Sequence, residues 1–223
     1  MLLRILVGIV VLAAFASTAR SETNSWLFVS LLQEKKIVTF QRDAETGELT
    51  RRGETDLPAE PAFLSVSGDN KILFASFRSS GELASFRIDP TNGRLTAISV
   101  VPGGDDPAYL LSDHTGRFLL SAYYLANKVT VHRLGPDGTI GATALQTIPT
   151  ADKAHGIAID SKNRMAFVPH TGANRIYQFR FDQRSGKLAA SSPPFVTSPG
   201  SEDHPRHIAM HPSDRWAYTS HEA

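Results

Sequence analysis

The sequence predicts an all-β fold, a β-propeller of four-stranded antiparallel blades, of which four to five are present. Three observations predict it. A turn signature recurs with its glycines 46, 45 and 48 residues apart. An apolar residue stands seven positions before each of these glycines. No stretch keeps a helical period, and four strands in about 45 residues is the period of a propeller blade.

Each period contains a tight turn. The polar residue before the glycine favours a turn, and the glycine accepts the positive φ that such turns require. The signatures are Thr46-Gly47-Glu48-Leu49, Asn92-Gly93-Arg94-Leu95, Asp137-Gly138-Thr139-Ile140 and Ser185-Gly186-Lys187-Leu188. The runs before these turns are short and mixed apolar, which predicts β-strands closing at Phe40, Phe86, Val131 and Phe179.

A second segment opens each full period. It begins at Pro61, Pro107, Ala154 and Pro205. Ten residues later a basic residue precedes or opens another strand: Lys71, Arg117, Arg164 or Arg215. The alternative is a β-sandwich with turns at similar spacing, but four registers that agree at several independent positions favour blades.

The chain divides into two predicted regions. Residues 1–19 predict a secretory signal peptide, with a positive charge at Arg4, an apolar run over 5–15 and cleavage after Ala19. The alternative is an uncleaved anchor helix, for which the apolar run is short. Residues 20–223 predict a partial propeller domain with repeats starting near 26, 61, 107, 154 and 205. Because the last repeat stops after its second strand, at Ala223, we expect a longer protein.

Composition argues against several kinds of partner. The chain has 23 Lys and Arg against 22 Asp and Glu and no basic block, so we expect no nucleic acid and, after signal cleavage, no membrane as partner. It has no cysteine, and a core of this size does not require disulfides. The expected location is periplasmic or secreted.

The stretch from Pro205 to Tyr218 reads Pro-Arg-His-x-x-x-His-Pro-x-x-Arg-x-x-Tyr, and Gly-x-Leu turns lie between the repeats. This combination resembles the seven-bladed propeller lactonases, which include 6-phosphogluconolactonases and carboxy-cis,cis-muconate cyclases. The resemblance extends from Trp26 to Ala223. It implies a lactone hydrolase that uses no metal or cofactor, acts on a small-molecule lactone and is a monomer when complete. By position it places the family's histidine, arginine and glutamate at His155, Arg206 and Glu222. A later arginine of the family has no counterpart in the 223 residues.

The repeat itself supports these positions. His155 and Arg206 follow the repeat starts, as do Ala62 and Ala108, and equivalent positions in a propeller lie on one ring around its axis. Glu222 shares a second ring position, at the end of the second strand, with Arg78, Tyr124 and Thr171. The three residues are therefore predicted to converge at the mouth of the channel. The competing structural interpretation has His155 capping a turn and Arg206 in an ordinary ion pair with Glu222.

Lactone opening needs a base, positive charge at the developing oxyanion and an acid for the leaving alkoxide. His155 can serve as base or acid. Arg206 would hold a substrate carboxylate or phosphate, or the oxyanion. Glu222 would orient His155 or carry the second proton transfer. The same residues serve lactone closure in reverse.

A non-enzymatic exported propeller of the surface-layer type, binding a ligand or a partner protein, is the competing function. His204, His207 and His211 have a spacing that suits a metal site on a helix, but they fall on a predicted strand and its turn, so no metal site is expected. Export favours an unphosphorylated or carboxylated lactone over a cytoplasmic sugar phosphate.

Overall fold

The structure, a computed structural model, describes residues 25–222. That range consists of strands and connecting loops and contains no helix, so it also contains no helix able to cross a membrane. The predicted signal peptide over residues 1–19 lies outside the described residues. Five antiparallel sheets follow one another along the chain, which confirms the predicted fold class.

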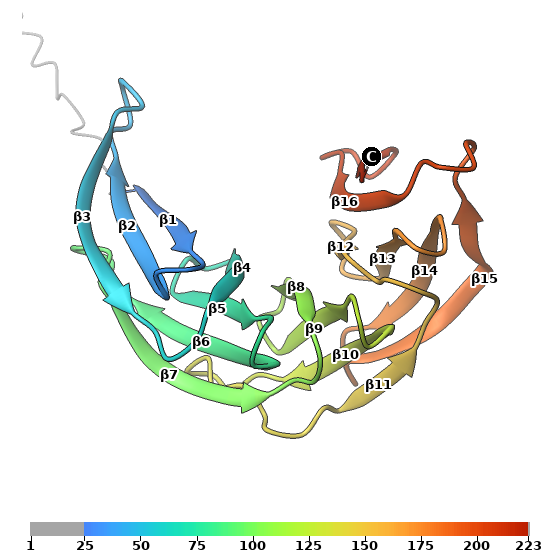
Figure 1. The fold of residues 1–223 in the computed structure, drawn as a ribbon, viewed down its shortest axis with the longest axis horizontal. Helices are drawn as coiled ribbons and strands as arrows, with labels where there is room; N and C mark the ends of the chain where they lie inside the picture. Colours follow the sequence, from blue (N-terminus) through green and yellow to red (C-terminus); the bar gives the residue numbers. More distant parts are fainter. Residues whose placement is uncertain (1–24, 223) are drawn as a thin grey trace, which may run out of the picture.

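The sheets stand side by side in an arc, with the first strand of each on the concave side (Figure 1). The first two blades contain β1 (Ser25–Leu31), β2 (Lys36–Arg42) and β3 (Leu49–Asp56), then β4 (Pro61–Val66), β5 (Ile72–Phe77), β6 (Glu82–Ile88) and β7 (Leu95–Pro102). The third contains β8 (Pro107–Ser112), β9 (Phe118–Tyr123), β10 (Lys128–Arg133) and β11 (Gln146–Pro149). The fourth contains β12 (Ala158–Ile159), β13 (Met165–His170), β14 (Arg175–Asp182) and β15 (Lys187–Thr197), and the fifth β16 (Pro205–Met210) and β17 (Ala217–His221).

Four expected strand ends and one expected strand start are wrong. The strands expected to close at Phe40, Phe86, Val131 and Phe179 continue for two or three residues, because pairing persists up to the turn, where Asp43 and Asp89 donate their N–H groups to Glu48 and Arg94. The strand expected from Ala154 is reduced to Ala158–Ile159, with one isolated bridge between Ala154 and His170. Three residues there face two on the partner strand, so the ladder is interrupted.

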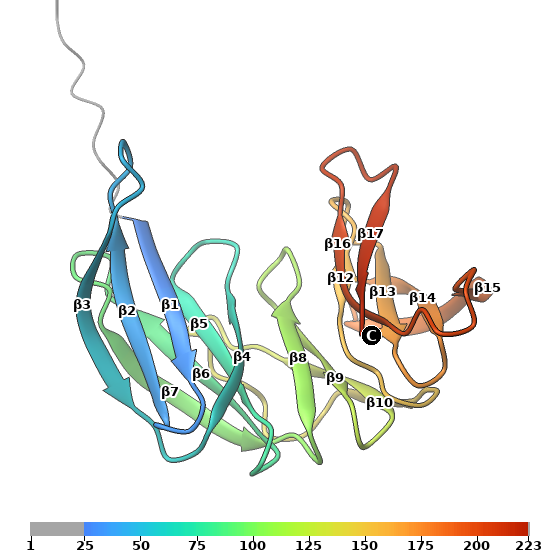
Figure 2. The same ribbon diagram turned by 45° about the horizontal axis from the view of Figure 1, so that its top comes forward.

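The hydrophobic core lies between the blades. Successive side chains of a strand point to opposite faces of its sheet. In β5, Leu73, Ala75 and Phe77 therefore join the cluster shared with the first blade, whereas Phe74 joins the cluster shared with the third. In β9, Phe118 packs toward the fourth blade in the same way. Neighbouring sheets thus bury facing surfaces against each other, and Figure 2 shows the blades side by side.

Three of the four repeated turn glycines also belong to the interfaces between blades. All four have positive φ. A Cβ at Gly93 would lie 2.6 Å from the Trp26 ring of the preceding blade, and one at Gly138 would lie 2.7 Å from Ile72. A Cβ at Gly186 would collide with the Phe118 ring. Gly47 has no atom within 4 Å of its Cβ position. The sequence predicted the turn geometry but not this contact between blades.

We predict that Gly186→Ala destabilises the 223-residue chain more than Gly47→Ala. Both substitutions force alanine into the left-handed region, at a cost of about 1–2 kcal/mol. Only Gly186→Ala also pushes a methyl group into the neighbouring blade, which adds about 1–3 kcal/mol. Urea unfolding followed by tryptophan fluorescence measures the difference. Equal midpoints for the two variants would contradict the interface role.

Candidate active site at the channel mouth

The inner strands β4, β8 and β16 begin at equivalent positions of the second, third and fifth blades. We call the rim of the arc formed by these strand starts the channel mouth. Here the residue before the repeat starts at Pro107, Ala154 and Pro205 accepts a backbone hydrogen bond from the residue that follows the second strand. Asp106 accepts from Tyr124 at 3.0 Å, Lys153 from Thr171 at 3.0 Å, and His204 from Glu222 at 2.9 Å. This repeated bond fixes Glu222 directly beside the start of the inner strand of its own blade. It is the physical basis of the second ring of positions.

A bulge produces the first ring. In the third blade Pro107 pairs with Tyr123, yet Tyr109 pairs with Ala122, so Ala108 is an extra residue. In the fifth blade the same shift between Pro205 and His207 makes Arg206 the extra residue. A bulge frees its residue from the ladder and redirects the side chain. The bulge was not predicted, although it determines where the repeat position points.

Gly156 brings the fourth and fifth blades together. A Cβ at this position would lie 2.9 Å from the carbonyl oxygen of Arg206 and 3.6 Å from the Cα of His207. The backbone beside His155 therefore approaches the backbone of Arg206 as closely as glycine permits. Sequence analysis did not single out Gly156. Its equivalents Phe63 and Tyr109 are large, and that contrast is the signal that could have found it.

His155 is buried among aromatic rings and is only 3 % exposed. Its ring meets those of His207 and Tyr124 edge to face, at centroid distances of 4.9 Å and 5.7 Å. Among the described residues, neither ring nitrogen of His155 has a hydrogen-bond partner. An unsatisfied buried polar atom costs about 1–3 kcal/mol, and such an atom calls for an explanation. Both nitrogens are thus buried and not hydrogen-bonded to any residue of the described chain.

Burial, and after it the positive charge of Arg206 together with His207 and Arg78, lowers the pKa of His155 to about 4. The imidazole is therefore neutral at neutral pH. One nitrogen then carries a proton and the other can accept one. Of the two roles expected for His155, the resting state suits the base. Burial and Arg206 also lower the pKa of His207.

Arg206 and Glu222 come together as expected, but Glu222 does not orient His155. The Arg206 Nε lies 3.1 Å from the Glu222 Oε2, in an ion pair whose side chains are 40 % and 42 % exposed. The second carboxylate oxygen, Oε1, accepts a hydrogen bond from the Tyr124 hydroxyl at 3.2 Å. The expected contact between Glu222 and His155 is replaced by these two contacts. Glu222 therefore positions Arg206, and the ion pair of the competing interpretation is present within the site.

Three further residues at the channel mouth were not expected as site residues. Arg78 forms a bidentate pair with Asp106, in which Nη2 lies 2.7 Å from Oδ2. The Arg78 guanidinium and the Lys153 ammonium each lie 5.5 Å from the centroid of the Tyr124 ring. Arg78 and Tyr124 share the repeat position of Glu222, so extending that ring argument to every blade would have identified them. Lys153 gave no such signal in the sequence.

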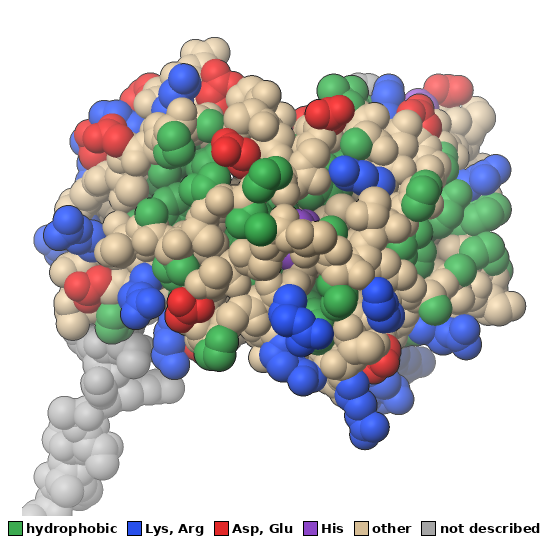
Figure 3. Space-filling model, turned by 90° about the horizontal axis from the view of Figure 1, so that it is seen from below, with side chains coloured by type: hydrophobic (Ala, Val, Ile, Leu, Met, Phe, Trp, Pro, Cys, Tyr) green, Lys and Arg blue, Asp and Glu red, His purple; other side chains and the backbone are tan. Residues whose placement is uncertain are grey.

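The described residues hold no group of three His, Asp or Glu side chains arranged to bind a metal ion. His207 lies on β16 and His211 follows it, as the strand assignment required. Figure 3 shows Lys, Arg, Asp and Glu side chains on one face of the molecule, in keeping with the near-neutral net charge.

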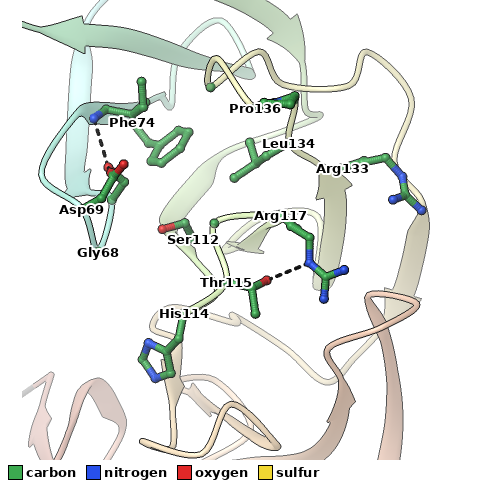
Figure 4. Close-up of a pocket in the computed structure, with 15 residues that line it drawn as sticks. Gly68, Asp69, Phe74, Ser112, His114, Thr115, Arg117, Arg133, Leu134 and Pro136 are labelled. Atoms are coloured by element: carbon green, nitrogen blue, oxygen red, sulfur yellow. Dashed lines mark hydrogen bonds between the residues drawn. The ribbon is translucent and has the colours of Figure 1, made fainter.

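A cavity of about 480 Å³ lies at the opposite end of the blades (Figure 4). Its lining comes from the turns after β4 and β8 and from the loop after β10. Arg117 there donates a hydrogen bond to Thr115, as the dashed line in Figure 4 marks, and Arg133 stacks on Phe118. Its charged groups already have partners, so we place the candidate site at the channel mouth instead.

Comparison with known proteins agrees with the fold and adds a family. A 6-phosphogluconolactonase of Erwinia tasmaniensis is 30% identical over 202 residues, which cover 91% of this chain and 46% of that protein. The periplasmic gluconolactonase of Pseudomonas aeruginosa is 27% identical with a TM-score of 0.75, over 88% of this chain and 61% of that structure. A candidate 6-phosphogluconolactonase of Bacteroides fragilis shares the fold, with 21% identity and a TM-score of 0.82 over 92% of this chain and 63% of that structure.

The chain spans about half the length of the curated relatives that it matches, such as the 46% of the Erwinia protein. The family described as "Lactonase, 7-bladed beta-propeller" matches residues 22–223, almost the whole chain. This match, with which the observed blades agree, shows that the chain belongs to the seven-bladed β-propeller lactonase family.

Proposed function

We propose that the protein hydrolyses a small sugar lactone or carboxylated lactone at the channel mouth, without a metal, using His155, Arg206 and Glu222. The observation that carries the proposal is the imidazole of His155. It is buried, neutral and beside Arg206, and neither of its nitrogens has a hydrogen-bond partner in the described chain. Membership of the lactonase family supports this activity over ligand binding by a non-enzymatic propeller.

The proposed reaction adds water across the ester bond of the lactone. The unprotonated nitrogen of His155 removes a proton from water as the oxygen attacks the lactone carbonyl carbon. The carbonyl oxygen becomes an oxyanion, which the Arg206 guanidinium stabilises. The ring C–O bond then breaks, and the imidazolium returns its proton to the departing alkoxide. The product is an open hydroxy acid.

Glu222 has a positioning role in this scheme. Its carboxylate holds the Arg206 Nε at 3.1 Å, which leaves the terminal guanidinium nitrogens to face the substrate. The Tyr124 hydroxyl fixes the other carboxylate oxygen. Guanidinium orientation matters because the planar fork of arginine binds oxyanions in a preferred geometry.

The proposal extends to location and assembly. The charged start, apolar run and small residues of 1–19 support export by a cleaved signal peptide. A relative from Pseudomonas aeruginosa is named a periplasmic gluconolactonase, which supports a periplasmic or secreted location. We also propose that the complete protein acts as a monomer.

We predict that His155→Ala lowers kcat for lactone hydrolysis by about 10²-fold or more, because general base help is lost. Ala62 and Ala108 occupy the same repeat position, so the fold tolerates alanine there. In the parent enzyme the active, neutral form of His155 disappears only as pH falls through its pKa of about 4. kcat/KM should therefore stay level from pH 7.5 to about 5 and fall below that. Stopped-flow assays with glucono-1,5-lactone, on protein expressed from its complete reading frame, measure both.

The matched control is His211→Ala. This histidine lies at the opposite end of the blades, where it hydrogen-bonds Ser213. It should keep parental kcat and the same pH profile. An acid limb near pH 6.5, or parental kcat in His155→Ala, would return His155 to a structural role.

We predict that Arg206→Lys lowers kcat/KM by about tenfold or more, although the charge is kept, because lysine lacks the planar fork. Glu222→Gln should lower kcat more than it raises KM, since it misorients Arg206. Steady-state kinetics on the same lactone separate the two parameters. Arg133→Lys, at the far end of the blades, is the control. If both site variants match the parent, the ion pair is a surface pair worth about 0–1 kcal/mol.

We predict that protein recovered outside the cytoplasm begins near Arg20. Signal peptidase cuts after small residues, and Ala19 ends the small-residue stretch. Mass spectrometry of the N-terminal peptide measures the cleavage point. An intact Met1 on membrane-held protein would contradict export by cleavage.

A further inference from the structure

We propose that Lys153 binds an oxyanion of the substrate, a phosphate or carboxylate group on the lactone, and thereby sets the preference of the site for charged lactones. This inference rests on the proposed lactonase function. It assigns a specificity residue outside the trio of His155, Arg206 and Glu222. Three observations carry it: the backbone of Lys153, its charge environment and its position beside Tyr124.

The backbone of Lys153 is fixed in an unusual conformation. Its φ is 59°, in the left-handed region, which most other positive-φ non-glycine positions of the described chain fill with Asn or Asp. The N–H group donates to the Asn127 side chain at 2.8 Å, and the carbonyl accepts from the Thr171 N–H at 3.0 Å. A lysine held in this conformation from both sides has a defined root for its side chain. Its equivalents Asp106 and His204 share this conformation, with φ of 58° and 48°, so the repeat itself fixes where the side chain starts.

Lys153 is also a cation of the channel mouth without a carboxylate partner. Arg78 is paired with Asp106, and Arg206 with Glu222 at 3.1 Å. Lys153 forms no ion pair with any residue between 25 and 222, and its side chain is only partly exposed. Its equivalents in the neighbouring blades are Asp106 and His204, so the positive charge is particular to this blade.

The Tyr124 ring connects this charge to the reacting groups. The Lys153 Nζ lies 5.5 Å from the ring centroid. The same ring meets His155 at 5.7 Å, and its hydroxyl contacts Glu222 at 3.2 Å. An anion bound by Lys153 would therefore sit one aromatic ring away from the base and from the Arg206 pair. The geometry suits a lactone whose charged substituent is separate from the ester group.

A purely structural role in a cation–π contact with Tyr124 is the competing explanation, and substrate charge distinguishes the two. The experiment measures kcat/KM of the parent, Lys153→Asn and Lys153→Arg. The substrates are glucono-1,5-lactone, its 6-phosphate and a γ-lactone bearing a free carboxylate. Asparagine accepts the left-handed backbone, so the fold is kept. The protein is expressed from its complete reading frame.

We expect Lys153→Asn to lower kcat/KM about tenfold for a charged lactone, as the loss of one charge-assisted contact implies. The neutral lactone should change less than about twofold, and Lys153→Arg should restore the charged substrate to within about threefold. The arm that responds, phosphate or carboxylate, identifies the anion. Raised salt should weaken the parent's preference, because the contact is partly exposed.

Lys35→Asn is the matched control. Lys35 is also a left-handed lysine, with φ 53°, but it is exposed in the turn after β1. It should behave like the parent on every lactone. Equal effects of Lys153→Asn on neutral and charged lactones, or no effect at all, would overturn the proposal.

A parent protein that hydrolyses none of the lactones would refute the proposed function and leave the anion site to be read by calorimetry with inorganic phosphate. Lys153→Asn should then weaken phosphate binding about tenfold relative to the parent and to Lys35→Asn. Absent or unchanged phosphate binding would overturn the assignment of Lys153.

Discussion

Burial of the facing sheet surfaces between neighbouring blades is the constraint on which the rest of the structure depends. The alternation of Phe74 against Leu73, Ala75 and Phe77 sends side chains of one strand into two separate cores. Because no blade has a core of its own, neighbouring blades must approach closely along their whole length. The turn glycines follow from this closeness, since Gly186 lies against the Phe118 ring of the preceding blade. The same packing brings the inner strands to one axis and so creates the channel mouth.

The repeat gives the channel mouth a backbone that can carry different side chains at equivalent positions. The bulge at the start of each inner strand and the backbone bond to the residue after the second strand recur whatever side chains are present. Ala108 and Arg206 occupy the same bulge, so a functional side chain replaces a small one without changing the backbone that carries it. Chemistry can then be concentrated in adjacent blades while the other blades keep a structural role. Gly156 contributes to this arrangement because its missing side chain lets the backbone of Arg206 in the fifth blade approach the fourth blade closely.

Sequence reasoning predicted the blades and the ring positions because both depend on local patterns that repeat. Turn glycines, apolar runs and the spacing to His155, Arg206 and Glu222 are all readable along one period. Contacts between blades were not readable. The hydrogen bond from Tyr124 to Glu222 joins residues 98 positions apart, and the repeat alone does not say which oxygen faces which neighbour. For this reason the repeat could not show that Glu222, one of whose two expected roles was to orient His155, forms no hydrogen bond with it. The low pKa of His155 likewise depends on burial, which only the packed blades define.

The electrostatics of the mouth couple substrate charge to the strength of the base. Burial and the positive charges of Arg206 and Arg78 hold the pKa of His155 at about 4, so in the empty site it is a weak base. An anion bound nearby would offset part of that positive charge and favour the imidazolium, which raises the pKa. The base would thus become stronger only when a charged substrate is present. Through this coupling, binding of a group remote from the ester would act on the chemical step as well as on affinity, which is how an enzyme discriminates in kcat rather than in KM alone.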